Sequence, residues 1–206
     1  MSSVFLTLIH DQVEREGISE LLEVLGAIIK GLAVPLKMEH LQWLHRILLP
    51  LYSAPGYLTY SAQLSYCTTH LITKDSSLAV PVVRGLIKTW PRTESAREVV
   101  MIQQMEDLLS VMQREQFMTV QTEYFHRVGQ CVASQHFLVA ERALQVWGNN
   151  IFREIIRTNI AVAMPILLPY IFRLGSVQVL HMHARGAYHI PDSDVTISLT
   201  GLFIIM

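Results

Sequence analysis

Apolar residues recur along most of the chain at intervals of three and four positions. From Ile18 they form one stripe: Leu21, Leu22, Leu25, Ile28, Ile29 and Leu32. This spacing places side chains on one face of an α-helix and predicts an amphipathic helix that ends near Gly31 and Pro35. A second stripe, made of Leu41, Leu44, Ile47, Leu48 and Leu51, runs to the turn signal Pro55-Gly56. The two stripes predict a helical hairpin.

The same pattern predicts three further hairpins. The second carries Leu64, Cys67, Thr68, Leu71 and Ile72, a cap at Asp75 or Ser76, and then Val80, Val83, Leu86, Ile87 and Trp90. The third has Thr93 as its cap and carries Met101, Met105, Leu108, Leu109 and Met112, then Phe117, Val120, Tyr124, Phe125, Val128 and Cys131. The fourth is less regular. It carries Ala140, Ala143, Leu144, Trp147, Ile151 and Ile155, then Met164, Leu167 and Leu168, with bends expected at Pro165 and Pro169.

The hairpins begin near Ile18, Thr59, Ser95 and His136, a step of about forty residues that is typical of HEAT and armadillo repeats. We therefore expect an all-α, HEAT/armadillo-like helical-repeat solenoid of about four hairpins over residues 1–173. Residues 174–206 lack the pattern, and we expect an irregular tail there, with disorder as one reading. An apolar stripe at Val4, Phe5, Leu8 and Ile9 has no earlier helix to pack on, which suggests that the chain begins inside an array.

Composition narrows the class of protein. Hydrophobic residues make up 51% of the chain and charged residues 16%, so we expect much of its surface to meet other apolar surfaces. The net charge is −1 and the 16 Lys and Arg are scattered, which argues against nucleic-acid binding. Cys67 and Cys131 fall on apolar stripes, as reduced cysteines do, and no secretion signal is evident, so we expect a cytoplasmic or nuclear protein. The apolar stretch Val195 to Met206 is too short to span a membrane.

Signatures of catalysis and cofactor binding are missing from the sequence. No G-x-x-x-x-G-K-[ST], G-x-G-x-x-G, H-E-x-x-H or G-x-S-x-G string occurs, so we expect no enzyme and no cofactor. His181 and His183, with His189, Asp192 or Asp194, could hold a metal ion if they lay on a strand. The chain has 9 histidines, however, so a chance pair is easy and we expect no metal site.

Several short strings resemble a known family. Gly17 to Gly26 reads G-I-S-E-L-L-E-V-L-G, and the strings L-L-P-L, Q-L-S-Y-C, K-D-S and K-T-W-P follow at 48–51, 63–67, 74–76 and 88–91. The longest is F-L-V-A-E-R-A-L-Q-V-W from Phe137 to Trp147, followed by G-N-N where the family tends to have W-N-N. Together they resemble the B-prime (B′) family of protein phosphatase 2A regulatory subunits, in register from about Val4 to Arg173.

The resemblance implies a function without an active site. Members of the family are HEAT-like solenoids that bind the phosphatase scaffold and catalytic subunits and recruit substrate proteins through short motifs of the L-x-x-I-x-E type. By this resemblance Val24 and Ile28 would form the wall of a pocket for the motif isoleucine. Lys37 and His40 would face the motif glutamate, and Glu23 would orient neighbouring basic groups. Periodicity alone would instead predict that the apolar residues of this set are partly buried packing residues and that the charged ones are solvated.

The chain also departs from the family pattern. The resemblance places the first half of the motif groove upstream of Met1, so we expect weak peptide binding by this chain alone and binding once the upstream hairpins are restored. After Arg173 the similarity stops, which suggests a truncated or mis-spliced gene model and leaves open a non-functional fragment. A generic helical-repeat adaptor or scaffold, binding some other helix or extended chain, is the alternative of a different class.

Overall fold

The computed structural model describes the backbone of residues 17–184 and the side chains of residues 17–173. Within these residues the secondary structure is helical, with no strand. The chain divides into two compact units, Met1–Val120 and Gln121–Met206, and the division falls inside helix α8 (Arg114–Val132). The all-α class and the helical repeats expected from the sequence are confirmed.

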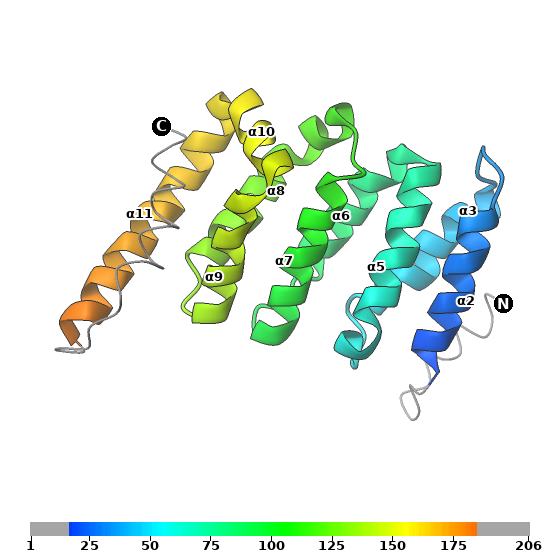
Figure 1. Ribbon diagram of the computed structural model, residues 1–206, viewed down its shortest axis with the longest axis horizontal. Helices are drawn as coiled ribbons and strands as arrows, with labels where there is room; N and C mark the ends of the chain where they lie inside the picture. The colour runs from blue at the N-terminus through cyan, green and yellow to red at the C-terminus, as the bar shows by residue number, and fades with distance from the viewer. Residues whose placement is uncertain (1–16, 185–206) are drawn as a thin grey trace. The chain divides into compact units, whose positions relative to one another are not determined.

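The first unit contains the first two predicted hairpins and the start of the third. Helix α2 (Ile18–Gly31) is followed by α3 (Met38–Trp43), the π-helical turn η1 (Leu44–Leu48) and α4 (Leu49–Leu51). Then come α5 (Tyr57–Lys74), the 3-10 turn η2 (Ser76–Leu78), α6 (Ala79–Lys88) and α7 (Ser95–Leu109). Helices α2, α5 and α7 lie side by side as the first helices of successive repeats (Figure 1). They begin close to the positions that the apolar periodicity predicts.

Two glycines introduce the first two repeats. Gly17 precedes α2 with φ 91° and Gly56 precedes α5 with φ 77°, both in the left-handed region. A residue with a Cβ is disfavoured there because the Cβ crowds the following carbonyl oxygen. The two glycines are one repeat apart, so they mark the same step in successive hairpins.

The predicted helix caps are partly confirmed. Asp75 caps η2, because its carboxylate accepts the Ser77 N–H at 3.0 Å and the Ser77 hydroxyl at 2.6 Å. The predicted cap at Thr93 is wrong. Helix α7 begins at Ser95, with Glu94 in the cap position and no side-chain cap. The Glu94 N–H bonds back to the Pro91 carbonyl at 3.2 Å, so Thr93 belongs to the turn before the helix.

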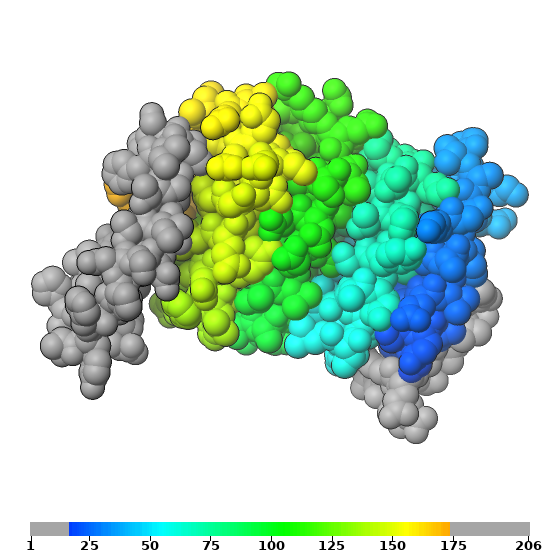
Figure 2. All heavy atoms as spheres, viewed as in Figure 1, coloured from blue at the N-terminus to red at the C-terminus, as the bar shows by residue number. Residues whose placement is uncertain are grey.

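Helix α2 packs against α5 at unusually short range. A Cβ built on Gly26 would lie 2.7 Å from Cδ1 of Tyr66 and 3.4 Å from Sγ of Cys67. The Cys67 thiol donates to the Leu22 carbonyl at 3.1 Å. On the face seen in Figure 2, atoms of α2 and α5 meet directly. The missing side chain of Gly26 therefore sets how closely these two helices approach.

A buried polar network links Tyr52, the residue that follows α4, to α5 and α7 inside the first unit. Tyr52 and Thr68 share a hydrogen bond of 3.0 Å between their hydroxyls. Gln104 bridges two tyrosines, since its amide nitrogen donates to the Tyr52 hydroxyl and its amide oxygen accepts from the Tyr57 hydroxyl at 3.2 Å. Buried polar groups that satisfy one another in this way specify one arrangement of the packed helices.

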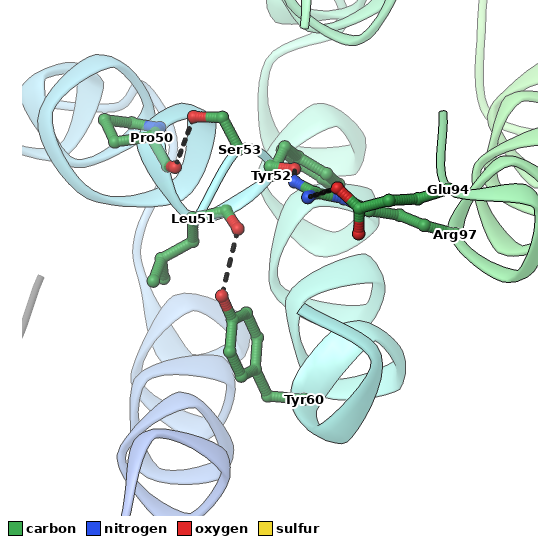
Figure 3. Close-up of polar contacts among 7 residues, drawn as sticks. All are labelled: Pro50, Leu51, Tyr52, Ser53, Tyr60, Glu94 and Arg97. Atoms are coloured by element: carbon green, nitrogen blue, oxygen red, sulfur yellow. Dashed lines mark hydrogen bonds and ion pairs between the residues drawn. The ribbon is translucent and has the colours of Figure 1, made fainter. Parts of the chain in front are cut away.

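Arg97 of α7 completes this network. Its guanidinium donates to the carbonyl of Tyr52 (Figure 3). The same guanidinium lies 5.2 Å from the centre of the Tyr57 ring. It also pairs with Glu94 at 3.4 Å, although the Glu94 side chain is 61% exposed and that of Arg97 only 8%. The guanidinium is thus held by a carbonyl and an aromatic face inside the unit and by a carboxylate at its surface.

Alkaline pH is expected to destabilise the first unit. Burial raises the pKa of the Tyr52 and Tyr57 hydroxyls above the usual value of about 10 and raises the pKa of the Cys67 thiol to about 12. The unfolded chain releases these protons first, so these three groups leave stability unchanged below about pH 8. Above it we expect a loss of up to about 1.4 kcal/mol per pH unit for each group. Urea unfolding at pH 8 and pH 10.5 measures the loss, which should be smaller in Tyr57→Phe. A pH-independent midpoint would contradict it.

The second unit contains α9 (Phe137–Gln145), the 3-10 turn η3 (Val146–Gly148), α10 (Asn150–Thr158) and α11 (Ile160–Ala184). The predicted core position Ile151 is wrong, and the phase of the helix differs from the predicted one. Ile151 is 42% exposed and Ile155 is intermediate, whereas Phe152 and Ile156 are buried. The helix stops at η3, and Asn149 caps a new one by accepting the Ile151 N–H at 2.8 Å. This break shifts the buried face of α10 by one residue.

An aromatic cluster forms the core of the second unit. The Phe152 ring centre lies 5.2 Å from that of Trp147 and 6.4 Å from those of Tyr124 and Phe125. Gly129 of α8 faces Tyr170 of α11, where a Cβ would come within 2.2 Å of the ring. Contacts between aromatic rings on α8, η3 and α10 stabilise this unit. Gly129 leaves the space that the Tyr170 ring fills.

Helix α11 continues through Pro165 and Pro169, so neither proline ends it. Its span beyond Arg173 means that the chain stays helical to Ala184, while the tail boundary at 173 stays a prediction. The stripe at Val4 to Ile9 and the stretch Val195 to Met206 lie outside the described residues. Among the helices that are described, none alone has the length and hydropathy to cross a bilayer. Residues 150–173 pass that test as a pair of helices bent by 112°.

Candidate functional site

The apolar part of the candidate site lies on one flank of α2. The buried face of this helix is formed by Ile18, Leu22, Leu25, Gly26 and Ile29. Val24 and Ile28 lie one turn apart beside that face, with Val24 51% exposed and Ile28 partly buried. The helix thus presents two apolar side chains that its own core does not cover.

The polar part of the candidate site lies at the start of α3. Lys37 occupies the N-cap position in extended conformation, and Nδ1 of His40 accepts the Lys37 backbone N–H at 3.3 Å. Since Nδ1 is the acceptor, a neutral His40 carries its proton on Nε2, where it can donate to a ligand. Lys37 is exposed, and no carboxylate among the described residues lies within ion-pair distance of its ammonium.

Glu23 lies on a different side of α2 from Ile28. Five positions along a helix turn by about 140°, so Glu23 and Ile28 lie on opposite flanks of α2. The Glu23 carboxylate accepts a hydrogen bond from the Gln63 amide of α5 at 3.3 Å. Its observed partner is therefore an amide of the next repeat, and its role in binding a ligand stays a prediction.

Val24 and Ile28 are joined to Lys37 and His40 by a short connection, residues 32–37, between α2 and α3. An apolar pair, a free ammonium and an imidazole N–H donor suit a ligand with an aliphatic side chain followed closely by a carboxylate. None of these four side chains is arranged as a nucleophile with a base.

The two histidines at the centre of the metal hypothesis lie on a helix. His181 and His183 fall within α11, a helix and not the strand that the hypothesis required. His189, Asp192 and Asp194 lie beyond the described residues. Within the described part of the chain, no three His, Cys, Asp or Glu side chains come together as metal ligands.

Sequence reasoning missed two residues that support this region, Gln63 and Lys74 of α5. Gln63 contacts Glu23, and the Lys74 ammonium donates to the carbonyl of Leu32 at 2.9 Å, just after the end of α2. Both lie on the same side of α5, since they are about three helical turns apart. Periodicity could have placed them on one face, but it could not have named their partners in α2.

Comparison with known proteins identifies the family. Residues 1–177 match the family model described as "Protein phosphatase 2A regulatory B subunit (B56 family)". The chain is 40% identical over 175 residues to the human 56 kDa regulatory subunit alpha isoform, covering 85% of this chain and 36% of that protein. It is 41% identical over 173 residues to the rabbit delta isoform, covering 84% and 30%. For the Schizosaccharomyces pombe delta 2 isoform the identity is 38% over 176 residues, covering 85% and 28%.

These matches confirm the resemblance to phosphatase 2A regulatory subunits drawn from the short strings. The chain spans about a third of the length of the curated relatives it matches. The matched residues include α2 and α3, which carry the candidate site. The chain therefore belongs to the B56 family of protein phosphatase 2A regulatory B subunits.

Proposed function

We propose that this chain selects substrates for protein phosphatase 2A by binding short L-x-x-I-x-E motifs at Val24, Ile28, Lys37 and His40. The relatives are named as regulatory subunits of this phosphatase, which supports a non-catalytic role within its holoenzyme. By this proposal the scaffold and catalytic subunits are its partners, and its place is in the cytoplasm or nucleus. Holding a motif near the catalytic subunit raises the local concentration of nearby phosphosites.

One observation supports the proposal: α2 leaves Val24 and Ile28 incompletely covered, and a short connection leads from this helix to the polar residues Lys37 and His40 at the start of α3. Val24 is 51% exposed and Ile28 partly buried, so a motif isoleucine could cover both. Burying such a side chain contributes about 1.5–3 kcal/mol. The motif glutamate would meet the Lys37 ammonium and the Nε2–H of His40 in charge-assisted hydrogen bonds.

Peptide binding tests the proposal. A chimera in which residues 1–177 replace the matching segment of the human alpha isoform supplies whatever that protein contributes outside this segment. We expect it to bind a labelled L-x-x-I-x-E peptide, measured by fluorescence polarisation. Ile28→Ala and His40→Ala should each weaken binding roughly tenfold, since each removes one half of the recognition.

Leu58→Ala provides the matched control, because Leu58 is an apolar residue 49% exposed elsewhere on the first unit. Its affinity should equal that of the parent chimera. A chimera that folds but does not bind the motif peptide would refute motif selection. The alternative function, a helical-repeat adaptor, would then remain. Assembly with the scaffold and catalytic subunits, measured by co-purification, tests the partners separately.

A further inference from the structure

Helix α3 buries none of its own side chains, so the segments on either side of it determine its position. None of its residues, Met38–Trp43, is buried, and the connection before it exposes Val34 to 64%. Only its far end continues into buried structure, at Leu44, Ile47 and Leu48 of η1. The near end, which carries Lys37 and His40, therefore depends on how the connection leaves α2.

Lys74 contacts the chain where the connection leaves α2. Leu32 is the residue after α2, and its extended backbone (φ −66°, ψ 138°) directs the chain into the connection. The Lys74 ammonium donates to the Leu32 carbonyl at 2.9 Å. A cation at this place also interacts favourably with the carbonyls that end α2, because a helix C-terminus carries partial negative charge.

The same flank of α5 holds α2 at two earlier points. Gln63 donates to Glu23 at 3.3 Å and the Cys67 thiol donates to the Leu22 carbonyl at 3.1 Å. Together with Lys74 these donors form a line of three along α5, which begins near Glu23 and ends at Leu32. The wall of the candidate site and the turn after it are thus tied to one helix of the next repeat.

We propose that Lys74 is a positioning residue of the motif-binding site, holding the α2–α3 connection so that Lys37 and His40 lie within reach of the motif glutamate. This role rests on the proposed function. Lys74 binds no ligand atom itself. It acts through the Leu32 carbonyl, and the part of the motif that should sense its loss is the glutamate and not the isoleucine.

Two peptides separate positioning from a general loss of structure. In the chimera, Lys74→Met keeps the aliphatic stem and removes the donor, and it should weaken the L-x-x-I-x-E peptide about five- to tenfold. The same variant should change binding of a peptide with the glutamate replaced by alanine less than about twofold. Lys74→Arg should restore most of the affinity because it can still donate to the carbonyl. Lys88→Met is the matched control, an exposed lysine in the last turn of α6.

Amide hydrogen exchange supplies a readout that needs no ligand. Exchange at residues 33–41 should become faster in Lys74→Met and remain unchanged in Lys88→Met. Equal losses for the two peptides, or no loss for either, would overturn the positioning role while leaving motif binding intact. A parent chimera that does not bind the motif would refute the proposed function, and this role with it, even if exchange showed that Lys74 restrains the turn.

Discussion

Replacing Phe152 with alanine is expected to lower the free energy of unfolding by about 3–5 kcal/mol, the largest effect of any change considered for this chain. Phe152 is fully buried, and its ring meets Trp147, Tyr124 and Phe125. Truncation would remove contacts with all three rings at once and leave a cavity that rigid neighbours fill poorly. Urea unfolding of the 206-residue chain, followed by circular dichroism, measures the change.

The neighbouring residue provides the control. Ile151 is 42% exposed, so Ile151→Ala should alter stability by less than about 1 kcal/mol. The two variants differ by one position in α10, and only the phase of the helix decides which is costly. A larger loss for Ile151→Ala than for Phe152→Ala would mean that α10 buries the face which the periodicity first predicted.

Arg97→Leu is expected to lower the free energy of unfolding by about 2–4 kcal/mol. The substitution leaves the Tyr52 carbonyl without its donor inside the unit and removes the cation from the Tyr57 ring. The ion pair between Arg97 and Glu94 contributes little to this loss of stability, because the Glu94 carboxylate is mostly in solvent. The midpoint of urea unfolding is the measurement.

Arg92 is the matched control for Arg97. It is an exposed arginine five positions earlier, in the turn before α7, and Arg92→Leu should stay within about 0.5 kcal/mol of the parent. If both substitutions cost the same, the network around Tyr52 would contribute nothing specific to stability.

Periodicity predicted the helices well where glycine or proline residues mark the helix boundaries in the sequence. The start of α2 and α5 coincides with glycines of positive φ, and Pro55, next to Gly56, already signals a turn in the sequence. The fourth hairpin was predicted poorly because η3 resembles a continuing helix in its apolar pattern. The extended backbone of Asn149 and its side-chain oxygen, which accepts the Ile151 and Phe152 N–H groups, show that a new helix begins.

The candidate site was predictable only in part for a similar reason. The resemblance named Val24, Ile28, Lys37 and His40, and spacing alone put the first two on one flank of α2. Neither the resemblance nor the spacing could show that Glu23 contacts Gln63. These residues are forty positions apart, so their contact depends on how two repeats pack. Lys74 escaped notice for the same reason, since a lysine at a helix end looks like an ordinary solvated charge.

Gly17 and Gly26, nine residues apart, are required for opposite reasons. A Cβ on Gly17 would meet no atom within 4 Å, yet the backbone there has φ 91°. At Gly26 the backbone is an ordinary helix, but the space is filled by the Tyr66 ring. One glycine therefore sets the direction in which the chain enters the repeat, and the other sets its distance from the next one. An alanine scan would score both as sensitive, and only a residue that tolerates positive φ, such as asparagine, could tell them apart.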